Sequence, residues 1–150
     1  MERARVAQLA EGDEVPSFSL PALDGGLLKW SDYVGHPTVL AVWAPWCPHC
    51  QKELPVLADA VAGSAEVRMV SVATAIDQAP HPPIEGYMAD HGLTFPVGLD
   101  DANDTLGRGL GVSAFPTVYF VGADGRVMHA TVGEIRSDEL RAILAKLGSG

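Results

Sequence analysis

Two cysteines, and no others, lie in this chain of 150 residues, as Cys47-Pro48-His49-Cys50. A disulfide across so short a loop would stabilise the fold little, because the stabilisation grows with loop length. A structural metal site normally needs four Cys or His ligands, and Cys47, Cys50 and His49 supply at most three, so no metal site is predicted. The spacing instead favours a redox-active pair that forms and breaks a disulfide.

The segments around the pair are those that position a reactive thiol. Residues 38–43 (TVLAVW) are apolar on both faces, which predicts a central buried strand. Pro48 is suited to the first turn of a helix, here predicted over 48–62. Cys47 would then lie at the helix N-terminus, where free N–H groups and the helix dipole favour a thiolate. Cys47 is therefore the predicted attacking thiol, and Cys50, one turn further on, the resolving thiol.

The residues beside the cysteines modify this prediction. A protonated or dipolar imidazole at His49 would further favour the Cys47 thiolate and make the protein more oxidising. We therefore predict a reduction potential between about −120 mV, as in DsbA, and about −270 mV, as in thioredoxin. The alternative is a solvated His49 with little effect. Trp46 would shield one side of the site, or simply pack.

The remaining pattern predicts an α/β layered sheet within one domain. Residues 1–14 are expected to form an N-terminal extension and 15–150 the domain. Asp-Gly turns predict two hairpins, one before the central strand and one near the C-terminus. The expected elements are a hairpin of 18–20 and 27–30, strands at 67–73 and 95–99, helical segments at 84–91 and 101–107, a hairpin of 117–121 and 127–132, and a helix from 137.

Composition excludes several classes of function. The net charge is −9 and the 10 basic residues are scattered, which argues against nucleic acid as a partner. The longest apolar stretch, 38–46, is too short to cross a membrane. Residues 1–14 lack the apolar core of a signal peptide. Both a cytoplasmic protein and an exported one with its anchor outside this sequence stay open.

Residues 16–147 resemble the TlpA/ResA branch of the thioredoxin superfamily. The resemblance implies a thioredoxin fold: a central mixed β-sheet flanked by helices, with an N-terminal β-hairpin and an inserted strand–helix segment. The 66 positions between Cys50 and Pro116 leave room for that insertion. The motifs that carry the resemblance are Phe18-Ser19-Leu20 with Asp24-Gly25, VLAVWAPWCPHCQKELPVL over 39–57, GVSAFPT over 111–117, and Asp124-Gly125 before the last strand.

The same resemblance assigns roles to residues outside the cysteine pair. Pro116 is expected to be cis and to face the cysteines, with neighbouring backbone pairing with a substrate chain, and Phe115 is expected to tune potential and substrate choice. Glu53 matches an acidic residue that manages the active-site protons, whereas Ala41 stands where plain thioredoxins place a buried aspartate. The expected catalytic residues are Cys47, Cys50 and Glu53; the expected substrate-binding residues are Trp46, Pro48, His49, Phe115 and Pro116.

The activity implied by the resemblance is dithiol–disulfide exchange with cysteine-containing protein substrates. A reductase of the TlpA/ResA type is favoured. A DsbA-like oxidase, which shares the Pro-His dipeptide, and a copper-binding or redox-sensing protein are the alternatives. Apocytochromes are possible substrates, and a membrane protein of the DsbD or CcdA kind is a possible electron donor. We expect no bound cofactor, a monomer, and an extracytoplasmic location in preference to a cytoplasmic one.

Overall fold

A five-stranded mixed sheet forms the centre of the computed structural model, which describes residues 7–149. The strand order is β5-β4-β3-β6-β7; β4 and β5 run parallel to β3, whereas β6 and β7 alternate in direction. A separate two-stranded sheet holds β1 and β2. The strands are β1 (Ser19–Pro21), β2 (Leu27–Lys29), β3 (Thr38–Trp43), β4 (Arg68–Ala73), β5 (Val97–Leu99), β6 (Thr117–Val121) and β7 (Val127–Val132).

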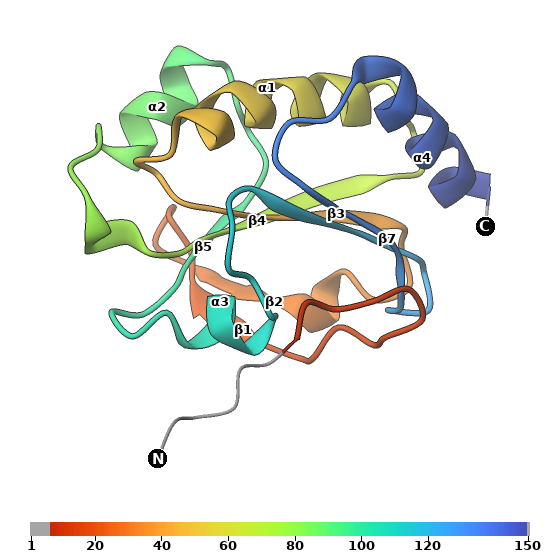
Figure 1. The fold of residues 1–150 in the computed structure, drawn as a ribbon, viewed down its shortest axis with the longest axis horizontal. Coiled ribbons are helices and arrows are strands. Elements are labelled where there is room, and N and C mark those ends of the chain that lie inside the picture. The colour runs from red at the N-terminus through yellow and green to blue at the C-terminus, as the bar shows by residue number, and fades with distance from the viewer. Residues whose placement is uncertain (1–6, 150) are drawn as a thin grey trace.

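Helices cover both faces of the sheet (Figure 1). Three of them, α1 (Pro48–Ala62), α2 (Ile84–Asp90) and α4 (Ser137–Ser149), lie on one face. The β1–β2 hairpin and the short α3 (Thr105–Gly109) lie on the other. Each face carries its own cluster of buried apolar side chains, so β3, β4 and β6 are buried on both sides. The thioredoxin-type α/β architecture predicted above is confirmed.

Most predicted elements are present at nearly the predicted residues. The central strand at 38–43 is buried along its whole length, as its unbroken apolar run indicates. The helical turn expected at 101–107 lies instead at 105–109, because the Asp100 carboxylate accepts the N–H groups of Leu106 and Gly107 and so fixes where α3 begins. Two short 3₁₀ helices, at 30–32 and 76–78, were not predicted.

The segment before the hairpin is hydrogen-bonded to the start of β7. Gly12 N–H donates to the Val127 carbonyl at 2.8 Å, and Val127 N–H donates to the Asp13 carbonyl at 2.8 Å. The division into an extension and a domain at residue 15 stays a prediction, and residues 1–6 of that extension lie outside the described part. No helix within residues 7–149 is long and apolar enough to cross a membrane.

Pro55 lies inside α1 and changes its hydrogen bonding near the cysteines. Proline has no N–H, so the carbonyl four residues earlier, on Gln51, loses its helical donor. The Tyr87 hydroxyl of α2 donates to this carbonyl at 2.8 Å. Burial, with a smaller contribution from Cys50, raises the pKa of Tyr87 to about 12, so the hydroxyl keeps its proton. The inserted helix thereby supports the first turn of the helix that carries the cysteines.

Tyr87→Phe should lower the free energy of unfolding by about 1–2 kcal/mol, because the freed Gln51 carbonyl then has no donor. Urea unfolding followed by circular dichroism measures this. Tyr33→Phe is the matched control, since no hydrogen bond of the Tyr33 hydroxyl is seen in the described structure. Equal losses in the two variants would show that the Gln51 contact contributes nothing specific.

Candidate active site

Cys47 lies at the junction of the central strand and the first helix, as predicted. It is the N-cap residue of α1, with extended backbone angles, and Pro48 occupies the first turn. The Cys47 N–H donates to the Ala44 carbonyl at 3.0 Å, and its carbonyl accepts from Gln51 N–H at 3.1 Å. These bonds fix the thiol at the positive end of a helix of 15 residues.

The two thiols differ in how far solvent can reach them. Both cysteines are free, so the structure shows the dithiol form. Cys47 is 7% exposed, whereas Cys50 is completely buried. Burial raises the pKa of the Cys50 thiol far above its ordinary value, and the neighbouring Cys47 raises it further. Cys47 is therefore the more accessible of the two thiols, and burial keeps Cys50 protonated.

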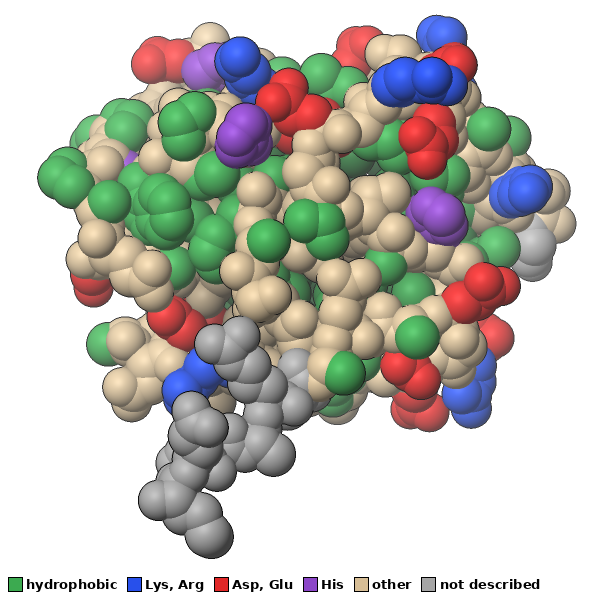
Figure 2. Space-filling view, viewed as in Figure 1, with side chains coloured by type: hydrophobic (Ala, Val, Ile, Leu, Met, Phe, Trp, Pro, Cys, Tyr) green, Lys and Arg blue, Asp and Glu red, His purple; other side chains and the backbone are tan. Residues whose placement is uncertain are grey.

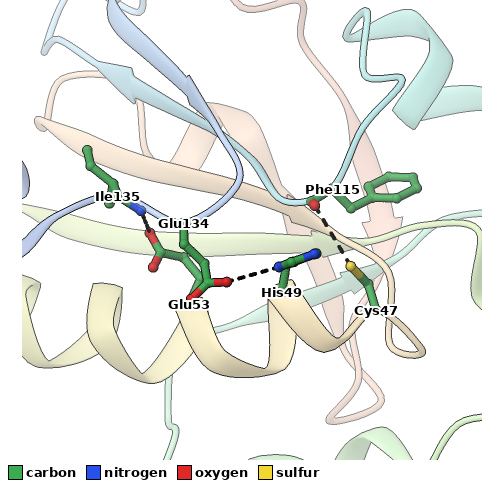
Figure 3. A network of polar contacts seen from close by, with 6 residues as sticks. All are labelled: Cys47, His49, Glu53, Phe115, Glu134 and Ile135. Carbon is green, nitrogen blue, oxygen red and sulfur yellow. Dashed lines mark hydrogen bonds and ion pairs between the residues drawn. The ribbon is translucent and has the colours of Figure 1, made fainter.

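The loop before β6 faces the Cys47 thiol. The Phe115–Pro116 peptide bond is cis, as the resemblance implied. The Cys47 thiol lies 3.8 Å from the Phe115 carbonyl oxygen and donates to it (Figure 3). Cys47 and Pro116 are thus brought together from parts of the chain nearly 70 residues apart. This loop presents backbone polar groups beside the reactive sulfur.

Trp46 and Phe115 form an aromatic wall next to Cys47. Their rings meet edge to face with centroids 6.0 Å apart. The Trp46 indole N–H donates to the Ala75 carbonyl at 2.6 Å, which holds the ring in place. Ala75 has a left-handed backbone, with φ of 53°, and its N–H is held by the Asp104 carboxylate at 3.0 Å. Two hydrogen bonds, from Trp46 to Ala75 and from Ala75 to Asp104, therefore hold the Trp46 ring in position.

Glu53 is a buried acidic side chain one turn after Cys50. It is 2% exposed, and one carboxylate oxygen accepts the Ile135 N–H at 3.2 Å. Burial raises the pKa of Glu53 to about 7, partly opposed by the Ile135 hydrogen bond and assisted by the negative charge of Glu134. A carboxyl group that titrates near neutral pH can both take and return a proton. The i to i+3 spacing places it on the same side of α1 as Cys50.

His49 contacts an acidic residue that sequence reasoning did not identify. Its Nδ1 lies 2.9 Å from a carboxylate oxygen of Glu134, in the loop between β7 and α4 (Figure 3). The hydrogen bond from His49, with Lys52 contributing less, holds the pKa of Glu134 below its ordinary value. Glu134 is 85 positions away in a segment without a motif, so no sequence signal could have paired the two.

The predicted site residues therefore gather at one end of the sheet. Trp46, Pro48 and His49 flank Cys47 in its own segment, while Phe115 and Pro116 approach it from the loop before β6. Their parts in substrate binding stay predictions, as does the catalytic part of Glu53. Across residues 7–149, no three His, Cys, Asp or Glu side chains are grouped as metal ligands would be.

The surface around the site is largely apolar. Figure 2 shows hydrophobic side chains gathered on the side of the molecule where α2 and the N-terminal end of α1 lie. The partly buried Trp46 and Phe115 side chains pack beside Cys47. Such a surface suits an unfolded or extended polypeptide better than a small polar substrate.

Comparisons with known proteins agree with this geometry. The family model described as Redoxin matches residues 10–146. The chain is 28% identical over 136 residues to the thiol-disulfide oxidoreductase ResA of Bacillus thuringiensis strain Al Hakam, covering 91% of this chain and 78% of ResA. It is 30% identical over 138 residues to the thiol:disulfide interchange protein DsbE of Vibrio cholerae, covering 91% and 72%.

A solved structure shows the same arrangement of elements. It is a secreted disulfide oxidoreductase of Mycobacterium tuberculosis, homologous to the DsbE of E. coli, and superposes with a TM-score of 0.72 at 29% identity. The match covers 87% of this chain and 96% of that one.

Proposed function

Because the chain belongs to the Redoxin family and is a ResA-like thiol–disulfide oxidoreductase of the thioredoxin superfamily, we propose that it reduces disulfides in exported protein substrates. The observation that carries this proposal is the contrast between the two thiols. Cys47 keeps a small exposed fraction, 7%, beside the Phe115 carbonyl, and Cys50 is completely buried. This contrast favours one fixed order of events.

The first step is attack by the Cys47 thiolate on a sulfur of the substrate disulfide. The substrate S–S bond breaks, a bond forms between Cys47 and one substrate sulfur, and the other sulfur leaves and takes up a proton. The backbone beside Pro116 would hold the substrate chain, with Trp46 and Phe115 as its apolar support. Pro48 and His49, both exposed, complete the contact surface.

The second step is release of the mixed disulfide by Cys50. Glu53 takes the Cys50 proton, and the resulting thiolate attacks the Cys47 sulfur. The Cys47–Cys50 disulfide forms and the second substrate sulfur leaves as a thiolate, so two electrons pass to the substrate. Burial of Cys50 delays this step until the substrate covers the site, and the raised pKa of Glu53 suits the base to neutral pH.

Partners follow from this direction of electron flow. A reductase must be reduced again after each cycle, and a membrane dithiol donor of the DsbD or CcdA kind would supply the two electrons. Apocytochromes, which need reduced cysteines, are fitting substrates. An extracytoplasmic location is part of the same proposal, since protein disulfides persist there.

The equilibrium reduction potential of the Cys47–Cys50 pair tests the direction. We expect a value below about −230 mV against glutathione, followed by tryptophan fluorescence. A value above about −180 mV would mean that His49 outweighs the scaffold and that the protein oxidises its substrates. Tight stoichiometric binding of Cu(I) that requires both cysteines, with no turnover of a disulfide substrate, would favour a copper carrier instead.

A further inference from the structure

The loop between β7 and α4 contacts three parts of the site through three consecutive residues. Gly133 N–H donates to the Pro116 carbonyl at 2.8 Å. The Glu134 carboxylate accepts from His49 Nδ1 at 2.9 Å, and Ile135 N–H donates to Glu53 at 3.2 Å. The glycine has φ of 82°, a left-handed conformation in which a side chain would be strained. The turn at residues 133–135 is thus hydrogen-bonded to Pro116 in the loop before β6, to His49 between the cysteines and to the buried Glu53.

From these contacts we infer that Glu134 is a positioning residue that sets the orientation and charge of His49 and thereby raises the reduction potential of the Cys47–Cys50 pair. The inference rests on the proposed disulfide exchange. An ionised carboxylate only accepts hydrogen bonds, so the proton of the His49 ring must be on Nδ1. The ring then extends from Glu134 toward the side of the helix on which Cys47 lies (Figure 3).

The charge of Glu134 acts through the same ring. A carboxylate at 2.9 Å stabilises the imidazolium by Coulomb attraction. A positive ring near Cys47 stabilises its thiolate, which exists only in the reduced protein, and so makes the protein more oxidising. Lys52 and Glu53 also interact electrostatically with Glu134, and within residues 7–149 neither forms a hydrogen bond with it.

The exposure of the His49 and Glu134 side chains limits how much Glu134 can change the reduction potential. The side chains of His49 and Glu134 are 66% and 46% exposed, so water and salt screen their attraction. Exposed ion pairs contribute little, so Glu134→Ala should change the equilibrium constant with glutathione only about two- to fivefold. For a two-electron couple this is a fall of about 10–20 mV.

A double-mutant cycle in the full chain tests the inference. The reduction potential against glutathione is measured for the unaltered protein, Glu134→Ala, His49→Ala and the double variant. Glu134→Gln keeps an acceptor for Nδ1 but removes the charge, so it separates orientation from charge. Glu66→Gln, at an exposed site before β4, is the control for loss of one negative charge. Alkylation of Cys47 by iodoacetamide at neutral pH is the second readout.

We expect Glu134→Ala to lower the potential and slow alkylation when His49 is present and to do neither in the His49→Ala background. Equal shifts in both backgrounds would overturn the inference, because Glu134 would then act without the ring. A rise in potential on removing Glu134 would also overturn it, since the carboxylate would then be acting by repelling the thiolate directly. Absence of any reversible Cys47–Cys50 disulfide would instead contradict the proposed function.

Discussion

Cys47→Ser is expected to abolish disulfide exchange, leaving only the uncatalysed rate with insulin and dithiothreitol. The reason is that the other thiol cannot take over: Cys50 is completely buried, and burial keeps it protonated. Exchange with a substrate disulfide is therefore expected to begin at Cys47 alone. Turbidity of reduced insulin gives the rate, and folding of the variant is checked by circular dichroism.

Cys50→Ser is the matched control, because it removes one thiol but not the attacking one. This variant should still attack a substrate disulfide but then accumulate as a covalent mixed disulfide, seen as a heavier species by mass spectrometry that a reductant removes. The pair of variants thus separates attack from release. Retention of activity in Cys47→Ser, or mixed-disulfide formation through Cys50, would contradict the assigned order.

The sequence predicts the strand–helix junction well because the signals there are local. An unbroken apolar run fits a strand buried on both faces, and a proline after Cys47 fits the first turn of a helix. The position of each thiol relative to the helix N-terminus then follows from spacing alone. Their different burial does not, since it depends on how α2 and the loop before β6 pack around them.

The parts of the site that sequence reasoning missed all depend on contacts between distant segments. Pro55 in the sequence indicates that the Gln51 carbonyl lacks its helical hydrogen-bond donor. Only the packing of α2 shows that the Tyr87 hydroxyl is the donor instead. Glu134 belongs to a loop that reads as an ordinary turn before an amphipathic helix. It reaches His49 because β7 ends beside the Pro116 loop, and no periodicity encodes that proximity.

Glu53 connects catalysis to stability, since its burial has opposite consequences for the two. Ionising a buried carboxyl group costs free energy, and this cost is what raises its pKa from 4.5 to about 7. The folded protein therefore binds the Glu53 proton more tightly than the unfolded chain does. The contribution of Glu53 to the free energy of unfolding is fully present below about pH 4.5 and is lost as the pH rises to about 7.

Glu53→Gln should remove this loss of stability. The amide resembles the protonated carboxyl group and can still accept the Ile135 N–H, so the variant and the unaltered protein should be similarly stable at pH 5. At pH 8 the variant should be more stable by roughly 2–3 kcal/mol. Urea unfolding at the two pH values measures the difference, with Glu66→Gln as the exposed control. A variant that is less stable at pH 8 would show that the ionised carboxylate is favourable in the folded protein.

Glu53→Gln should also slow release of the mixed disulfide. Burial of Glu53 therefore affects both the stability of the protein and the rate of this step. As a base, Glu53 must be ionised to take the Cys50 proton, so the release rate of the unaltered protein should rise with pH through about 7. Glu53→Gln should lose that rise and be slower on the order of 100-fold at pH 8. With Ellman's reagent, the second phase of thionitrobenzoate release reports this step by stopped-flow absorbance. If the variant is more stable at pH 8 and also slower there, the ionised Glu53 lowers the stability of the folded protein but serves as the base for Cys50. If the rate of the second phase is unchanged, Glu53 does not take the Cys50 proton.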